Sequence, residues 1–302
     1  MPIKNSKKYT FSGHESFACK LLWLKKAYDF IIESNSFNES DSVIKLGVGK
    51  NMVASIKYWS RAFGLIDEKG LSTEIADYIF GKTGRDIYLE DIGTLWLLHY
   101  HLIKTDKASI YNLVFNEFKK ERSYFTKEQL LAFIKRKYDE NGIINLYNEN
   151  TINLDINIFL KNYLRPSSDD QVDIEEDFSG LLLELDVLKN FKQKDVDNRL
   201  VNWYQFEHNE RDNIPCEIIF YSILDNFENS TTISFNDLLI GNNSPGLIFS
   251  INSDGLYKKL IEITNSYNNV TYSETAGNQI LQISKKFNPY MVLNGYYKKN
   301  SQ

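Results

Sequence analysis

Two glycines, Gly47 and Gly49, interrupt a stretch whose apolar residues otherwise recur at helical spacing. A short helix is predicted before them, over 42–46, and a longer helix after them, over 50–63. Glycine tolerates the unusual φ angles that a very short turn between two steeply crossing helices requires. The segment therefore predicts a helix-turn-helix, which restricts what the N-terminal part of the chain can fold into.

A compact β-hairpin is predicted directly after this pair of helices. Gly64 is a suitable left-handed end for the second helix, and an apolar pair, the turn 67–70 and a return strand over 71–73 follow it. Helix, glycine turn, helix and hairpin follow one another in the order of a winged helix-turn-helix. Winged helices bind either DNA or other proteins, so both interpretations stay open at this point.

The second helix of the motif has one side suited to a core and another suited to DNA. Met52, Ile56, Trp59 and Phe63 recur at steps of four, three and four, which predicts a buried seam. Asn reads adenine, Lys and Arg hold phosphate or read guanine, and Tyr or Ser bonds a phosphate oxygen. The same residues would also suit a solvated helix face. The candidate DNA-binding residues are Lys50, Asn51, Ser55, Lys57, Tyr58 and Arg61.

Positive charge is concentrated at the N-terminal end of the chain. Residues 1–66 hold ten basic and five acidic side chains, a local charge of +5, although the whole chain carries −5. A patch that binds phosphate needs only a few converging cations, so the negative total does not exclude DNA as a partner. Residues 169–188 carry eight acids and no base, which is typical of a solvated loop or of a surface for a basic partner.

The rest of the chain is predicted to be mainly helical. Ser12 and Glu15 have the S-x-x-E spacing of a capping box, which predicts that a long helix begins there and runs to about Ile32, with His14 exposed in its first turn. Thr126 and Gln129 have capping-box spacing as well. Further helices are predicted over 74–81, 91–102, 110–118, 126–138, 150–164, 214–227, 234–240 and 254–266, and two strands over 270–272 and 279–283.

The predicted fold class is mainly α with small β-hairpins. It has a winged helix-turn-helix at the N-terminal end, a helical middle and a second winged-helix-like module at the C-terminal end. The expected domains are a DNA-binding-like domain over 1–85, a helical region over 86–166, an acidic linker over 167–213 and the C-terminal module over 214–302.

Neither a catalytic nor a metal-binding constellation stands out. His99 and His101 point in different directions on a helix, and Cys19 and Cys216 cannot form a four-cysteine zinc site. No nucleotide-binding loop or nucleophile-elbow pattern is present. The expectation is a protein that is not an enzyme and needs no cofactor or metal. With no apolar run of about 18 residues, it is expected in the cytoplasm without a membrane partner.

At FSGHESFACKLLWLKKAYDF and IKLGVGKNMVASIKYWSRAFGLI the chain resembles a bacterial family known only as a domain of unknown function. The later segments SPGLIF, ETAGNQ and GYY fit the same family, so the resemblance covers most of the chain. It implies a gene context: members occur in phage-defence and DNA-modification islands, near phosphoadenosine-phosphosulfate-reductase-like genes of the phosphorothioation type. The family-like motif residues are Gly47, Gly49, Lys50, Asn51, Tyr58, Trp59 and Gly64.

These observations predict a non-catalytic DNA-binding or adaptor subunit of an antiphage defence or DNA-modification system. Double-stranded DNA and other defence proteins are the expected partners, among them a phosphoadenosine-phosphosulfate-reductase-like enzyme. The alternatives are a protein–protein scaffold without DNA binding, a winged-helix transcriptional regulator, and an enzyme that uses His14 and Glu15.

Overall fold

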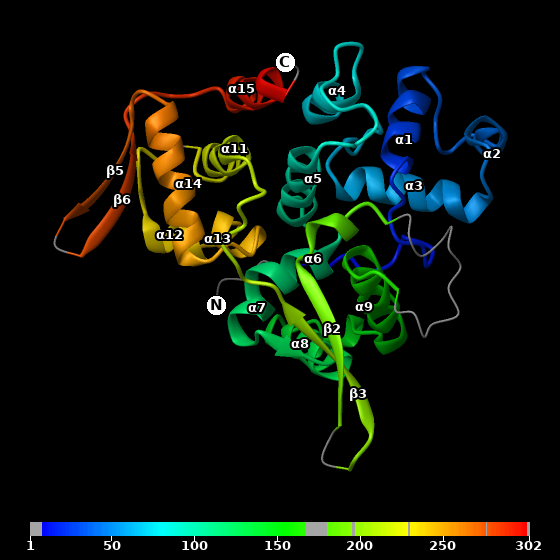
Figure 1. The fold of residues 1–302 in the computed structure, drawn as a ribbon. Coiled ribbons are helices and arrows are strands. Elements are labelled where there is room, and N and C mark those ends of the chain that lie inside the picture. Colours follow the sequence, from blue (N-terminus) through cyan, green and yellow to red (C-terminus); the bar gives the residue numbers. More distant parts are fainter. Residues whose placement is uncertain (1–7, 167–179, 195–196, 229, 276, 301–302) are drawn as a thin grey trace, which may run out of the picture. The chain divides into compact units, whose positions relative to one another are not determined.

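A computed structural model describes residues 8–166, 180–194, 197–228, 230–275 and 277–300. The described residues are mainly helical, with two three-stranded antiparallel sheets (Figure 1). Contacts within the chain group it into two compact units. Unit 1 holds Met1–Glu90 and His101–Phe206, and unit 2 holds Asp91–Tyr100 and Glu207–Gln302.

The N-terminal helices of unit 1 form where the local signals predict them. They are α1 (Trp23–Ile32), α2 (Ser42–Leu46), α3 (Lys50–Ala62) and α4 (Glu74–Phe80). Gly47 caps α2 at φ +62°, so the tight turn rests on a left-handed glycine as expected. Phe30, Leu46 and Val53 bury a small core among the first three helices. This packing fixes α3 against its neighbours along one side.

Two local expectations in this region are wrong. Helix α1 begins only at Trp23, so Ser12 and Glu15 do not cap it. Val53, not the half-buried Met52, joins the buried side of α3. The predicted hairpin over 65–73 does form in a short version: Ile66 and Ser72 make an antiparallel bridge, and the Thr73 amide donates to the Leu65 carbonyl oxygen at 3.1 Å.

The remaining part of unit 1 is a helical layer with a small sheet. Thr126 and Gln129 form the expected capping box at the start of α8. The sheet order is β1-β3-β2, and Asn190 lies opposite Tyr204 in its register. The elements are α6 (Ser109–Leu113), a π-helical turn (Val114–Phe118), α7 (Lys119–Glu121), β1 (Tyr124–Phe125), α8 (Lys127–Glu140), α9 (Glu149–Tyr163), β2 (Leu188–Lys194) and β3 (Leu200–Phe206).

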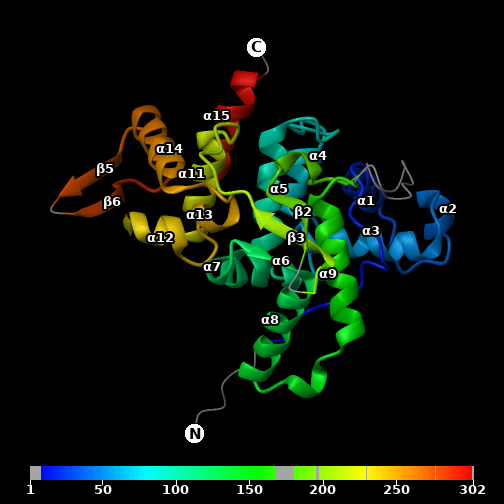
Figure 2. The ribbon, with the colours of Figure 1, turned by 60° about the horizontal axis from the view of Figure 1, so that its bottom comes forward.

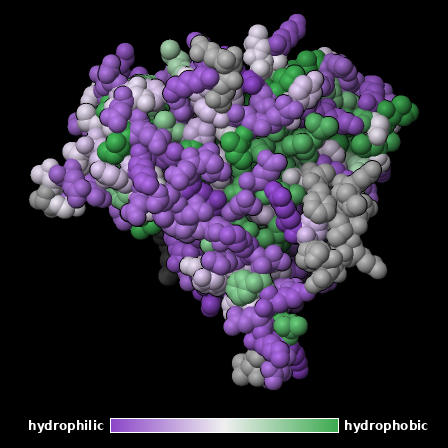
Figure 3. All heavy atoms as spheres, viewed as in Figure 1, coloured by the Kyte–Doolittle hydropathy of each residue, from purple (hydrophilic) through white to green (hydrophobic). Residues whose placement is uncertain are grey.

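The β2–β3 hairpin lies inside the range that the sequence assigned to an acidic linker. Figure 3 shows its surface as mostly hydrophilic, with small hydrophobic spots. Among its large apolar residues, Phe191 is 38% exposed and Leu200 is 68% exposed. The acidic residues of 169–177 lie outside the described residues.

Unit 2 combines helices with the second sheet, whose order is β4-β6-β5. Figure 2 shows its hairpin β5–β6 beside α14. Helix α11 packs against α14 and α15, and the Tyr297 hydroxyl lies 2.7 Å from Thr94 Oγ1 at the start of α5. The elements are the first part of α5 (Ile92–Lys104), α11 (Cys216–Asn226), β4 (Thr232–Ser234), α12 (Phe235–Ile240), α13 (Pro245–Ile248), α14 (Ser253–Ser266), β5 (Val270–Thr275), β6 (Asn278–Ile283) and α15 (Pro289–Asn300).

The two units do not follow the four ranges expected from the sequence, since 86–166 is shared between them. The mainly helical class and the strands over 270–275 and 278–283 agree with expectation. In the described part of the chain, no helix has the length and apolar character needed to cross a bilayer.

Candidate nucleic-acid interface

Helix α3 presents one stripe of cationic and small side chains to solvent. Lys50, Ala54, Lys57 and Arg61 follow each other at steps of four, three and four, so they lie on one face of the helix. Lys50 and Ala54 are exposed, and Lys57 and Arg61 are partly exposed. Asn51 is also exposed, beside Lys50 in the first turn. Four of the six candidate residues therefore lie on the accessible part of α3.

Ser55 and Tyr58 do not belong to this stripe. Ser55 is completely buried, so the expectation that it faces outward is wrong. Tyr58 packs against Gly13 and lies edge-on to His14, with 5.8 Å between ring centroids. Burial raises the pKa of Tyr58, and the Asp155 carboxylate raises it further. A loop from the N-terminal segment covers this side of α3.

Lys57 and Arg61 are both held near the helix surface. The Lys57 ammonium donates a hydrogen bond to Asn38 Oδ1 at 2.8 Å, and burial, with the Arg61 charge, lowers its pKa. Arg61 donates from Nη2 to the Glu68 carbonyl oxygen at 3.4 Å. In the described part of the chain, Arg61 Nε is buried without a hydrogen-bond partner. Both side chains keep donors that an incoming acceptor could engage.

Acidic groups on the adjoining segments pair with other lysines. Lys45 Nζ lies 3.3 Å from Glu39 Oε2 and 2.9 Å from Asp41 Oδ2. Lys107 forms an ion pair with Glu68. Within the described ranges, no carboxylate lies within ion-pair distance of Lys50, Lys57 or Arg61. The positive charge of the stripe is therefore not cancelled by a direct partner.

The sequence FSGHESF forms a loop anchored on α9. The Ser12 amide donates to the Asp155 carboxylate at 2.9 Å, and the Ser16 amide donates to His14 Nδ1 at 3.1 Å. His14 Nε2 lies 3.4 Å from Asp155 Oδ2, and the His14 side chain is only 4% exposed. Ser12, Glu15 and Ser16 have positive φ angles, which a helix does not allow. The expected exposed His14 in a first helical turn is therefore wrong.

The chain after this loop is held by hydrogen bonds to α3, to α9 and to the backbone at Leu181. Trp59 Nε1 donates to the Phe17 carbonyl oxygen at 3.0 Å, and the Cys19 amide donates to Asn162 Oδ1 at 3.1 Å. The Leu181 amide donates to the Cys19 carbonyl oxygen at 2.9 Å. The backbone from Phe17 to Lys20 is thus fixed, and it forms one wall of a cavity.

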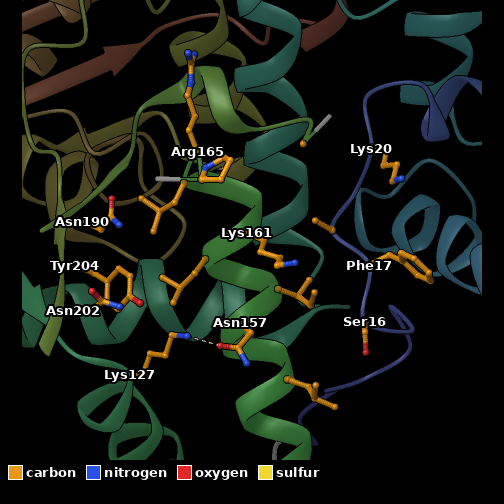
Figure 4. Close-up of a pocket in the computed structure, with 17 residues that line it drawn as sticks. Ser16, Phe17, Lys20, Lys127, Asn157, Lys161, Arg165, Asn190, Asn202 and Tyr204 are labelled. Carbon is orange, nitrogen blue, oxygen red and sulfur yellow. Dashed lines mark hydrogen bonds between the residues drawn. The ribbon is translucent and has the colours of Figure 1, made fainter. Parts of the chain in front are cut away.

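This cavity in unit 1 has a volume of 510 Å³ and lies over one face of α9. Figure 4 shows the loop with Ser16, Phe17 and Lys20 on one side of α9 and the β2–β3 hairpin on the other. Sequence reasoning missed its cationic residues, because they come from segments far apart in the chain; only one of them lies in the FSGHESFACK motif. They are Lys20, Lys127, Lys161 and Arg165.

The histidine and cysteines considered as possible metal ligands lie inside the units. His99 Nε2 lies 2.9 Å from the Ile248 carbonyl oxygen, and Cys19 and Cys216 are buried free thiols. Across the described residues, no three His, Cys, Asp or Glu side chains are grouped closely enough to hold a metal ion.

Two solved structures are similar to this chain over almost its whole length. One is an SspB crystal structure with 27% sequence identity and a TM-score of 0.81, and the match covers 96% of this chain and 88% of that chain. The other is a magnesium ion-bound SspB crystal structure with 26% identity and a TM-score of 0.80, with the same coverage of both chains. No curated protein matches the sequence. Residues 11–297 match the family described as "Protein of unknown function (DUF4007)", and the chain therefore belongs to that family.

Proposed function

We propose that this chain is a non-catalytic DNA-binding or adaptor subunit of a bacterial antiphage defence or DNA-modification system of the phosphorothioation type. The observation that carries the DNA part is the unpaired cationic stripe of α3, formed by Lys50, Lys57 and Arg61. The stripe lies on a helix that follows a tight glycine turn, as in a helix-turn-helix. Double-stranded DNA is the proposed partner, in the cytoplasm.

The length of the stripe fits the backbone of a duplex. Arg61 lies eleven positions after Lys50, which corresponds to about 16 Å along a helix axis at 1.5 Å per residue. The major groove of B-DNA is about 12 Å wide, so the two ends of the stripe can reach phosphates on both of its walls. Asn51 is exposed next to Lys50 and is the candidate for a base contact.

Lys50 occupies a position that is unfavourable for the isolated protein. It is the first residue of α3, where the helix dipole and free amides favour an anion. A bound phosphate would use both the ammonium group and these amides. A lysine at this position therefore supports an anionic partner more than a purely structural role.

The order of elements supports a winged-helix interpretation of both units. In unit 2, β4 follows α11, and the hairpin β5–β6 follows α14 and pairs with β4. In unit 1 the wing would be the short bridge between Ile66 and Ser72. We propose these as modules that contact DNA or a partner protein.

The likeness to SspB supports a role beside other defence proteins, and we propose a phosphoadenosine-phosphosulfate-reductase-like enzyme among them. Co-purification of the tagged chain with the products of neighbouring genes tests this part. Co-purification without any retention of DNA would favour the scaffold alternative. A symmetric dimer that reads paired half-sites would favour a transcriptional regulator.

A mobility-shift assay with a DNA duplex of random sequence tests the proposed DNA binding. Each phosphate contact lowers log K by about 0.9 for every tenfold rise in salt concentration. Between 1 M and 0.1 M salt one contact thus strengthens binding roughly eightfold, and its removal loses that factor at 0.1 M. Lys50→Ala/Lys57→Ala should therefore bind duplex more weakly and flatten the salt slope by about 2. The matched control is Lys285→Ala/Lys286→Ala, which removes two exposed lysines from unit 2.

Absence of binding at about 50 mM salt would overturn the DNA part, because backbone contacts are strongest at low salt. An equal loss of duplex binding in Lys50→Ala/Lys57→Ala and in the control would overturn the assignment of DNA binding to α3. Since one similar structure holds a magnesium ion, supercoiled plasmid should also be incubated with Mg²⁺. Cleavage by wild-type protein that persists through purification would overturn the non-catalytic part.

A further inference from the structure

The cavity of unit 1 lies apart from the stripe of α3 and has its own chemistry. At 510 Å³ it falls within the range of about 300–1,000 Å³ typical of small-molecule sites. Its walls are a loop pinned by three hydrogen bonds, two helices and a two-stranded hairpin. A site with walls fixed in this way is largely formed before a ligand arrives.

Four cations line this cavity, and its described lining contains no acid. Lys20 comes from the loop, Lys127 from the start of α8, and Lys161 and Arg165 from the end of α9 (Figure 4). The C-terminal end of α9 contributes about half a negative charge near Lys161 and Arg165. In the described ranges, no carboxylate forms an ion pair with Lys20, Lys127 or Arg165. An anion in the cavity would give these three groups a negative partner.

Lys127 shows this imbalance most clearly. Its ammonium donates to the neutral Asn157 Oδ1 at 2.6 Å, and burial lowers its pKa. Lys127 is also the first residue of α8, directly after the N-cap Thr126, where a positive charge opposes the helix dipole. Burial and the helix dipole therefore both disfavour the charged form of this lysine, which faces the cavity.

Neutral polar groups gather at the hairpin side of the cavity. Asn202 and Tyr204 alternate onto one face of β3, and Asn190 is the cross-strand partner of Tyr204. Figure 4 shows these side chains directed toward the cavity from the side opposite Lys20. Amide groups can pair with the edge of a nucleobase, which offers both donors and acceptors. Figure 4 shows Lys127 on the same side of α9 as these groups, so the cavity places a cation beside neutral amides.

We propose that this cavity binds a nucleoside phosphate. The phosphate lies against Lys127 and Lys161, and the base lies against Asn190 and Asn202. The shared chemistry is that of a nucleotide unit, whose source is either a free nucleotide or a nucleic-acid strand. The inference does not depend on the proposed function, because it concerns different residues.

Calorimetric titration of the full chain tests the proposal with three probes: AMP, inorganic phosphate, and a single-stranded oligodeoxyadenylate of about ten nucleotides. Charge-assisted hydrogen bonds are each worth about 1.5–3 kcal/mol, so loss of one weakens binding roughly tenfold or more. Lys127→Gln/Lys161→Gln should therefore weaken AMP binding at least about tenfold. The control Lys285→Gln/Lys286→Gln should bind as wild type, and thermal melting checks that each variant is folded.

Asn202→Ala separates a nucleotide site from a simple anion site. It should weaken binding of AMP and leave binding of inorganic phosphate unchanged. Tighter binding of AMP would identify a free nucleotide as the source, and tighter binding of the oligonucleotide a strand; either result supports the proposal. Failure of both to bind, or phosphate binding as tight as AMP with no effect of Asn202→Ala, would overturn it. Duplex binding by the α3 variants is measured separately, so the two proposals fail independently.

Discussion

The imidazole of His14 is buried with its Nε2 atom 3.4 Å from Oδ2 of Asp155, a residue of α9 that is itself only 2% exposed. The same carboxylate accepts the Ser12 amide at 2.9 Å. Two groups of the FSGHESF loop thus converge on one buried acid from a distant part of the sequence. This pairing holds the loop that covers α3 and forms a wall of the cavity.

Asp155→Ala should lower the free energy of unfolding by about 1–3 kcal/mol, because it leaves the Ser12 amide without its acceptor and removes the carboxylate beside the buried His14 ring. Urea unfolding measures the change as a lower midpoint with an unchanged slope. Glu15→Ala is the control, since this acid is in the same loop and exposed. It should change stability by less than about 0.5 kcal/mol. Equal effects of the two substitutions would contradict the anchoring role.

Gly13 allows the loop to approach α3 closely. Its φ is +101°, and a Cβ atom would lie 2.7 Å from Cδ2 of Tyr58. Gly70 also has a positive φ, of +85°, but a Cβ there would meet nothing within 4 Å. Both Gly→Ala substitutions should therefore lose about 1–2 kcal/mol through the backbone.

Gly13→Ala should lose about 1–3 kcal/mol more than Gly70→Ala, because it also forces the Tyr58 ring to move. Chemical denaturation of both variants under the same conditions gives this difference directly. If the two variants unfold at the same denaturant concentration, the close contact with Tyr58 does not constrain the loop.

Both cysteines should be unreactive in the folded protein. Burial raises the pKa of the Cys19 thiol, and burial together with the Glu217 charge raises that of Cys216 to about 12. The thiolate is the reactive form, and a pKa near 12 leaves about one thiolate in ten thousand at pH 8. A thiol-specific disulfide reagent at pH 8 should label neither cysteine in native protein and both in denaturant. Rapid labelling of the native protein would contradict this expectation.

The α2–α3 region could be predicted from sequence because its signals are local. The spacing of Ile56, Trp59 and Phe63 and the left-handed Gly47 depend only on nearby residues, and the bounds of α2 and α3 agree with them. Ser55 was placed on the wrong side, because it lies four residues before Trp59, at the edge of the buried seam, where it is fully buried. Tyr58 could not be placed, because a helical pattern does not reveal the loop that packs on it.

The FSGHESF loop shows the opposite situation. Its S-x-x-E spacing fits a helix cap, but the Ser12 amide bonds to Asp155 of α9, which no local pattern indicates. The sequence pattern did not predict the cavity for a related reason. Lys127 and Arg165 become neighbours of the loop only after α8 and α9 have packed.

Lys50→Glu should change stability and DNA binding in opposite directions. An acid in the first turn of α3 complements the helix dipole, so the free energy of unfolding should rise by about 0.3–1 kcal/mol. Duplex binding should fall sharply, because the reversed charge repels a phosphate. Thermal melting and a mobility shift on the same preparation measure both effects. A variant that is less stable than wild type, or that binds DNA equally well, would contradict the functional interpretation of Lys50.

Lys127→Gln should likewise stabilise the free protein at neutral pH. The wild-type lysine opposes the dipole of α8, a term of about 0.3–1 kcal/mol, and burial disfavours its charged form. Urea unfolding of the variant and of the wild type at pH 7 measures the gain. The control is Lys135→Gln, an exposed lysine in the middle of α8, which should give no gain.

The advantage of Lys127→Gln should shrink as the pH rises toward 10. Because the pKa of Lys127 is lower in the folded than in the unfolded state, the folded protein releases this proton first. The unfolded state then binds more protons, so the wild type gains stability with pH between the two pKa values, and the uncharged Gln does not. Urea midpoints at several pH values follow the difference between the two proteins. A difference that stays constant or widens with pH would mean that Lys127 is not a strained cation.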